Sequence, residues 1–125
     1  AASDVYKRQA LGCAQLENLD RYVADKRETA ACYAEFFKGK EDITFFTEPA
    51  DCKSNYWLNA VVLKDKAAQL DFLEYTNDHG VMTRPVWELM NRLPMFEHCE
   101  TDGLENTEWL ADRVVNIPSS VRLDK

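Results

Sequence analysis

The segment 10–37 carries one apolar stripe with the period of an α-helix, and this feature constrains the fold most strongly. The stripe consists of positions spaced alternately three and four apart, which are Leu16, Leu19, Val23, Ala30, Tyr33 and Phe37. Lys26 is the only charged residue on it, and Gly39, a residue type that commonly ends helices, lies just beyond its end. The spacing predicts a long amphipathic helix over residues 10–37 that leaves another domain and packs along this one.

The rest of the chain alternates short strand and helix patterns. Extended patterns rich in β-branched and aromatic residues occur at residues 43–46, 55–63, 81–87 and 114–117. Helical patterns occur at residues 66–79 and 107–113. This order predicts an α+β fold, with a long N-terminal helix and a small, mostly antiparallel sheet that has helices packed on one face.

Three residues set boundaries within this pattern. Asp65 precedes a helical segment and is a candidate N-cap, and Gly80 comes after the same segment as a candidate C-cap. Pro85 has no N–H to donate to a sheet and disfavours helical geometry at Arg84. The strand near Arg84 is therefore expected to end there or to lie at a sheet edge.

Composition and charge limit the class of protein. A chain of 125 residues with 46% hydrophobic content has the size and composition of one globular domain. Its net charge of −7 disfavours a nucleic-acid partner, and no apolar run approaches the ~20 residues that span a bilayer. The four cysteines, Cys13, Cys32, Cys52 and Cys99, form no CxxC pair. They are typical of reduced cysteines in a cytoplasmic protein.

The first nine residues differ from the rest of the chain. The segment AASDVYKRQ has no initiator methionine and does not join naturally to the helical pattern. We interpret residues 1–9 as a non-native segment and residues 10–125 as the domain. The chain is accordingly expected to be a fragment of a longer protein, truncated on its N-terminal side.

Arg84 is the most informative single residue for function. Its guanidinium is attached to backbone restricted by Pro85, which suits a carboxylate or phosphate ligand. Trp87 can stack on a sugar or base, and Asn91 adds polar donors. In the alternative interpretation, Arg84 is a surface arginine paired with an acid, Trp87 is a core residue and Asn91 is solvated.

Sequence motifs of other catalytic classes are missing. Neither GxGxxG, GxxxxGK[ST] nor GxSxG occurs. His98 and Cys99 are adjacent, which suits a tetrahedral metal site poorly, and no other pair has ligand spacing. The residues alone therefore predict no catalytic, cofactor-binding or metal site.

Several segments together resemble the small domain of the DegT/StrS aminotransferases. ALGCAQLENLDRYVADKRETAACYAEFF resembles the long helix that opens this domain, and NYWLNAVVL resembles the strand that comes next. GVMTRPVWELMNRLPMF resembles the segment at the active-site mouth, and ADRVVNIPSSVRL resembles the closing helix-to-strand turn. The resemblance implies the C-terminal small domain of a fold-type I enzyme dependent on pyridoxal phosphate (PLP).

The resemblance also implies a reaction. Enzymes of this type move an amino group from an amino acid, usually glutamate, to a keto nucleotide-sugar, and they build their sites across a homodimer. The TRPVW segment resembles the subgroup that aminates C4 of UDP-linked 4-keto-6-deoxy-amino sugars. By position, Arg84, Trp87 and Asn91 would face the sugar nucleotide or the amino donor.

The Schiff-base lysine of the family, the acid on the pyridine nitrogen and the phosphate cup belong to the upstream domain of these enzymes. No lysine here stands in the family's lysine motif. The chain alone is therefore predicted to be inactive, with PLP bound by the missing domain. Two alternatives stay open: a stand-alone α+β module that binds a ligand or protein at Arg84 and Trp87, and a structural domain without a site.

Overall fold

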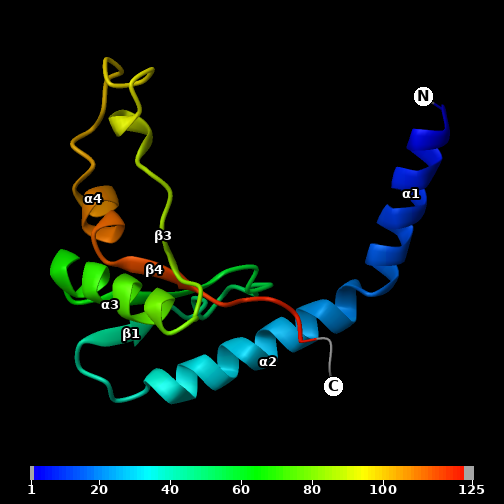
Figure 1. The fold of residues 1–125 in the computed structure, drawn as a ribbon, viewed down its shortest axis with the longest axis horizontal. Coiled ribbons are helices and arrows are strands. Elements are labelled where there is room, and N and C mark those ends of the chain that lie inside the picture. The colour runs from blue at the N-terminus through cyan, green and yellow to red at the C-terminus, as the bar shows by residue number, and fades with distance from the viewer. Residues whose placement is uncertain (1, 123–125) are drawn as a thin grey trace.

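A four-stranded antiparallel sheet forms the centre of the protein. In the computed structural model, which describes residues 2–122, the strands are β1 (Ile43–Phe45), β2 (Asn59–Leu63), β3 (Arg84–Pro85) and β4 (Val114–Ile117). Their order is β1-β2-β4-β3 (Figure 1). Val61 pairs with Phe45 on one side and with Val115 on the other. The predicted edge position of the strand at Pro85 is confirmed, since β3 lies at one end of this order.

The helices α2 (Leu19–Phe37) and α3 (Lys66–Asp78) cover one face of the sheet. Side chains alternate between the two faces of a strand, and in β2 and β4 the odd-numbered residues are the buried ones. The core cluster consists of Ala30, Phe45, Val61, Leu63, Val115 and Ile117, and residues of α2 and α3 pack against it. This arrangement confirms the predicted α+β fold with helices on one face.

The single long helix expected over residues 10–37 is wrong, because the helix is interrupted at Asn18. Helix α1 (Ala2–Glu17) and α2 meet there. The Asn18 side chain donates to the carbonyl of Ala14, and its backbone N–H donates to that of Gln15. Such side-chain bonds compete with the regular helical ladder. α1 then leads away from the sheet, and Leu16, on the predicted apolar stripe, is 69% exposed (Figure 1).

Helix α1 runs through residues 9 and 10 without a break. A continuous helix does not distinguish native residues from appended ones. The interpretation of residues 1–9 as non-native therefore stays a prediction, as does the assignment of 10–125 as the domain.

Local signals place most other boundaries. The Asp65 side chain accepts from the backbone N–H of Ala68, so the predicted N-cap of α3 is confirmed. Gly39 and Gly80 end α2 and α3 with positive φ angles of 75° and 76°. The strand expected over residues 55–63 is shorter, because β2 begins only at Asn59. The positive φ of 45° at Tyr56 is incompatible with extended structure there.

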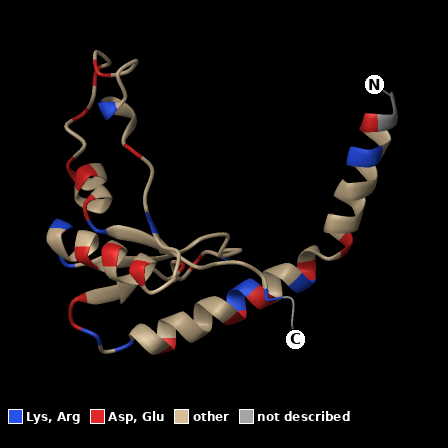
Figure 2. Cartoon of the chain, in the orientation of Figure 1, with Lys and Arg blue, Asp and Glu red and all other residues tan. Residues whose placement is uncertain are grey.

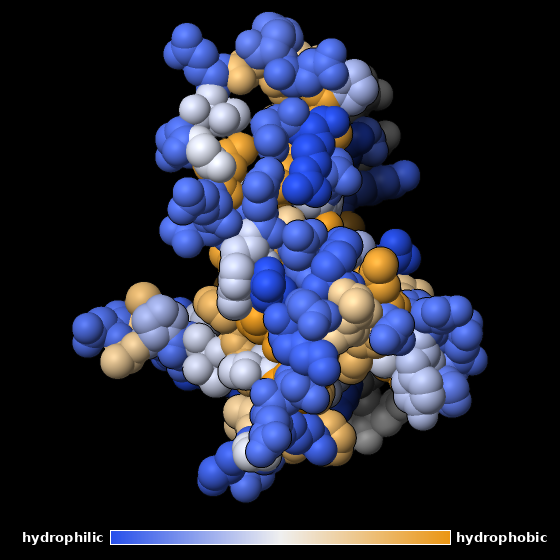
Figure 3. Space-filling view, turned by 90° about the vertical axis from the view of Figure 1, so that its left-hand side faces the viewer, coloured by the Kyte–Doolittle hydropathy of each residue, from blue (hydrophilic) through white to orange (hydrophobic). Residues whose placement is uncertain are grey.

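A long arm connects β3 to β4. It contains a 3₁₀ turn, η1 (Met90–Arg92), and ends in α4 (Glu105–Ala111), two residues earlier than the helix expected at 107–113. Figure 1 shows the arm standing away from the sheet, and Figure 3 shows hydrophobic atoms between polar ones over this upper part of the molecule. Across residues 2–122, no helix combines the length and the apolar character that a membrane crossing needs.

Candidate functional site

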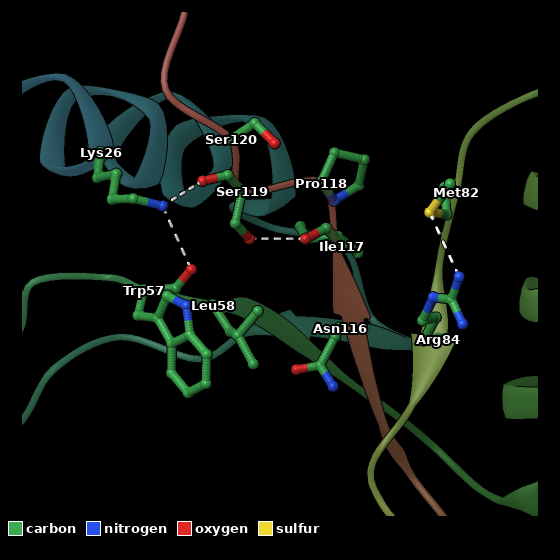
Figure 4. Close-up of a pocket in the computed structure, with 10 residues that line it drawn as sticks. All are labelled: Lys26, Trp57, Leu58, Met82, Arg84, Asn116, Ile117, Pro118, Ser119 and Ser120. Atoms are coloured by element: carbon green, nitrogen blue, oxygen red, sulfur yellow. Dashed lines mark hydrogen bonds between the residues drawn. The ribbon is translucent and has the colours of Figure 1, made fainter. Parts of the chain in front are cut away.

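A hollow of about 470 Å³ opens where β3, β4 and the segment just before β2 approach the side of α2. Its walls come from parts of the chain that are distant in sequence (Figure 4). The lining residues are Lys26, Trp57, Leu58, Met82, Arg84, Asn116, Ile117, Pro118, Ser119 and Ser120. The hollow therefore combines two cations with apolar side chains and short polar ones.

Lys26 is half-buried and ties α2 to two other segments. Its Nζ donates to the main-chain carbonyl of Ser119 at 2.5 Å and to that of Trp57 at 3.4 Å. Both acceptors are uncharged, and within residues 4–122 no carboxylate forms an ion pair with this ammonium. Figure 2 shows acidic and basic residues close together along the first half of α2, and Lys26 is the one of them that lines the hollow. Its positive charge is thus directed at the hollow without a compensating acid.

Arg84 reaches the hollow from the opposite side, on β3. The preceding residue, Thr83, is buried and bonded to α3: its hydroxyl lies 2.6 Å from that of Thr76, and its carbonyl accepts from Asn77. Arg84 pairs with Asn116 of β4, so both side chains lie on the sheet face opposite the helices. The guanidinium contacts the Met82 sulfur at 3.7 Å. In the described part of the chain it has no carboxylate partner.

The three predicted substrate-binding residues do not share one hollow. Trp87 is 73% exposed on the arm, so its interpretation as a core residue does not hold. Asn91 lies in η1 and lines a second, largely apolar hollow of about 440 Å³ together with Leu89 and Phe96. Of the three, Arg84 alone lines the main hollow, across from Lys26, and the roles of all three stay predictions.

Sequence reasoning missed Lys26, Asn116 and Ser119 as site residues. Lys26 does carry a signal, since it is the one charged residue on an apolar stripe. Its partners Trp57 and Ser119 are 31 and 93 residues away in sequence, which no local pattern reveals. The sequence pattern favours sheet packing for Trp57, but this residue precedes β2 and lines the hollow.

An ion pair fixes the loop that leads to Trp57. Arg27, next to Lys26, donates to both carboxylate oxygens of Glu48, at 2.6 and 2.9 Å, and to the carbonyl of Ser54. The backbone N–H of Ser54 donates back to Glu48, and the Glu48 N–H donates to the Tyr56 hydroxyl. These bonds hold Tyr56 in its left-handed conformation. They thereby set where the next residue, Trp57, meets Lys26.

The hydrogen bond from Arg27 and the one from the Ser54 backbone lower the pKa of Glu48 from 4.5 to about 2. Because the pKa is lower in the folded than in the unfolded chain, the ionised carboxylate stabilises the fold above pH 4.5. That contribution is lost as the pH falls from 4.5 to about 2.

We expect Glu48→Gln to melt at a lower temperature than the unchanged chain at pH 7, and the difference to shrink steadily between pH 4.5 and pH 2. Thermal melts followed by circular dichroism at several pH values test this. Glu35→Gln is the matched control, because Glu35 lies on α2 with a side chain 78% exposed. A difference between Glu48→Gln and the unchanged chain that persists at pH 2 would contradict the assigned role of the carboxylate.

Comparison with known proteins identifies the family. A model of the DegT/DnrJ/EryC1/StrS aminotransferase family matches residues 8–125. The chain belongs to this family. The resemblance seen in the four sequence segments is therefore confirmed.

The relatives of this member of the DegT/DnrJ/EryC1/StrS family are much longer proteins. It is 28% identical over 113 residues to the putative pyridoxal phosphate-dependent aminotransferase EpsN of Bacillus subtilis, covering 87% of this chain and 29% of that protein. It is 26% identical over 113 residues to the GDP-perosamine synthase of Vibrio cholerae, covering 88% of this chain and 30% of the synthase. The chain thus spans about three-tenths of the length of the curated relatives it matches.

Solved structures share the fold. Helicobacter pylori PseC, an aminotransferase involved in the biosynthesis of pseudoaminic acid, superposes with a TM-score of 0.82 at 19% identity, over 92% of this chain and 32% of PseC. The sugar aminotransferase CalS13 from Micromonospora echinospora gives a TM-score of 0.75 at 26% identity, over 89% of this chain and 29% of CalS13. The α+β arrangement is therefore that of a segment of sugar aminotransferases.

The described residues do not form a site for the PLP cofactor of this family. Such a site needs a lysine free to form a Schiff base beside groups that hold the phosphate and the ring nitrogen. Among residues 4–122, Lys26 is the one lysine that lines the main hollow, and its ammonium is bonded to two carbonyls. The other described lysines, Lys7, Lys38, Lys40, Lys53, Lys64 and Lys66, are exposed or lie outside that hollow.

Proposed function

We propose that this chain is the C-terminal small domain of a PLP-dependent nucleotide-sugar aminotransferase, and that the hollow at Lys26 and Arg84 faces the substrate. The family match over residues 8–125 is the observation that supports this most directly. The matched share of the relatives, about three-tenths of their length, fits one domain of a larger enzyme. PLP, bound outside the described residues, would supply the chemistry of amino-group transfer.

Within that enzyme the described residues would bind and orient substrate. Arg84 is the residue we assign to an anionic group, because its guanidinium lies at the rim of the hollow and lacks a carboxylate partner within the described chain. The neighbouring surfaces of Trp57, Leu58 and Pro118 would cover the less polar part of the substrate and exclude water from it. We keep Trp87 and Asn91 as proposed substrate contacts. Both lie on the arm, so they would reach a substrate in the main hollow only if the arm moved toward it.

We propose that the acceptor is a keto nucleotide-sugar and the donor an amino acid, with glutamate first among those to test. The TRPVW resemblance favours amination at C4 of a UDP-linked 4-keto-6-deoxy-amino sugar. The GDP-perosamine synthases among the relatives make a GDP-linked keto sugar the second acceptor to assay. A homodimeric, cytoplasmic enzyme is part of the same proposal.

Arg84→Ala is the test of the assigned substrate contact. In the protein encoded by the complete reading frame that contains these residues, we expect the KM for the sugar nucleotide or glutamate to rise about tenfold, with kcat changed much less. The assay follows 2-oxoglutarate release from glutamate with UDP- and GDP-linked keto sugars. Arg21→Ala is the control, since Arg21 is an exposed arginine on α2 that contacts the Tyr22 ring. Kinetics unchanged by Arg84→Ala would remove Arg84 from the site, and a reading frame without a lysine-bearing domain would overturn the proposed enzyme.

A further inference from the structure

Two polar side chains at the contact between α2 and the sheet have buried atoms with no hydrogen-bond partner within the described chain. These atoms are the hydroxyl oxygen of Thr29 on α2 and both amide atoms, Oδ1 and Nδ2, of Asn59 on β2. Asn59 is 1% exposed, which closes its amide off from bulk solvent. A buried polar atom without a partner lowers stability, and nearly all such atoms in folded proteins are paired with protein groups or ordered water. These three atoms therefore call for a partner that is not a protein side chain.

Thr29 faces the segment that follows β4. It lies one helical turn from Lys26 and one turn from Tyr33, on the same face of α2. The Lys26 ammonium donates to the carbonyl of Ser119, and the Tyr33 hydroxyl donates to the carbonyl of Pro118 at 3.0 Å. Because Thr29 lies between these two anchored side chains, its hydroxyl is held beside the same two residues.

The Asn59 amide approaches the same place from the sheet. The Asn59 backbone N–H donates to the hydroxyl of Ser119 at 2.7 Å. Its side chain lies on the buried side of β2, as does that of Val61. Val61 belongs to the core cluster together with Ala30, the residue next to Thr29 on α2. The three unpaired atoms therefore lie at one end of the contact between α2 and the sheet, without being bonded to one another.

Water fits these atoms better than an ion does. The Asn59 amide offers an acceptor and a donor, and the Thr29 hydroxyl can serve as either. A buried water both donates and accepts, and it typically makes about three hydrogen bonds. An anion would leave the amide oxygen unpaired. A cation would leave the amide nitrogen unpaired and would meet the positive charge of Lys26, which is bonded to the neighbouring Ser119.

We propose that one internal water molecule binds between α2 and β2, with the Asn59 amide and the Thr29 hydroxyl as its ligands. This water joins the helix to the sheet at the place where the apolar core ends and the polar contacts of Lys26 begin. It satisfies buried groups that would otherwise lower the stability of the fold. The proposal concerns a contact within the chain, so it holds or fails independently of the proposed enzymatic function.

The first test is a crystal structure of the 125-residue chain at a resolution that shows ordered water. We expect a water oxygen at hydrogen-bond distance, about 2.7–3.2 Å, from the Asn59 amide and from the Thr29 hydroxyl. A direct bond between Thr29 and Asn59, bonds from Asn59 to other protein groups, or a dry contact would each overturn the proposal.

The second test is the stability of Thr29→Val, which keeps the shape of the side chain and removes the hydroxyl. If the hydroxyl binds the water, the equilibrium constant for unfolding should rise about fivefold, because the water loses a partner. If the hydroxyl is unpaired, the constant should fall, because the cost of burying it disappears. Thr107→Val is the matched control, since Thr107 is an exposed threonine on helix α4, and it should change the constant less than about twofold.

A double-mutant cycle tests whether one site joins the two residues. Asn59→Leu is made alone and together with Thr29→Val, and unfolding in urea is followed by circular dichroism. If both residues bind the same water, the combined effect should differ from the product of the single effects by at least about threefold in the unfolding constant. Independent effects, or an unchanged or lower constant in Thr29→Val, would contradict a shared water. If Asn59→Leu fails to fold, Thr29→Val and the crystal structure still decide.

Discussion

Replacing Phe45 with alanine is expected to cost about 3–5 kcal/mol of the free energy of unfolding, the range found for deleting a buried aromatic ring. Phe45 is 6% exposed and belongs to the core cluster. Its ring centroid lies 5.9 Å from that of Tyr33 on α2 and 6.4 Å from that of Tyr56 in the loop before β2. The variant would leave a cavity where helix, loop and sheet meet. Urea denaturation followed by circular dichroism measures the loss.

Phe46 provides a matched control for this variant. It is the next residue in the chain, carries the same side chain and is 58% exposed. Its backbone N–H donates to the Ala60 carbonyl, and alanine retains that bond. Phe46→Ala should therefore change the free energy of unfolding by less than about 0.5 kcal/mol. Similar losses in both variants would mean that α2 does not pack on the sheet through Phe45.

The elements that could be predicted from the sequence are those set by neighbouring residues. Pro85 fixes an edge strand because it lacks an N–H group, whatever the rest of the chain does. Asp65 caps α3 because its side chain accepts a bond three residues ahead. The break at Asn18 escaped prediction because the apolar period continues across it. Leu16 and Leu19 keep the helical spacing yet lie 69% and 48% exposed.

The candidate site likewise contains one residue that local sequence identifies and others that only the folded chain brings together. Arg84 was identifiable because Pro85 restricts its backbone, and the structure places it at the hollow. Lys26 and Trp57 take their roles from contacts that only the folded chain creates. The Arg27–Glu48 pair joins residues 21 positions apart, and it controls the loop that presents Trp57. The sequence could therefore point to one wall of the hollow but not to the wall opposite.

Gln69 makes long-range hydrogen bonds that local sequence does not predict, and losing them should lower the free energy of unfolding substantially. Its side chain is 0% exposed, and its Nε2 donates at 2.9 Å to the carbonyls of Ala111 and Val114, 42 and 45 residues away. These bonds join α3 to the junction between α4 and β4. Gln69→Met keeps the volume but removes both donors, and each buried acceptor that loses its partner costs about 1–3 kcal/mol. Because both bonds here are only partly buried, we expect a total loss in the lower part of the summed range, about 2–4 kcal/mol in the free energy of unfolding.

The same exchange at Gln15 separates this effect from a general effect of methionine. Gln15 lies on the exposed helix α1, so Gln15→Met should change the free energy of unfolding by less than about 0.5 kcal/mol. Amide hydrogen exchange adds a local readout: in Gln69→Met, protection should fall first in β4, because the junction that feeds this strand loses its link to α3. Unchanged stability in Gln69→Met would show that other groups satisfy the two carbonyls, and the position of β4 beside the hollow would then depend on strand pairing alone.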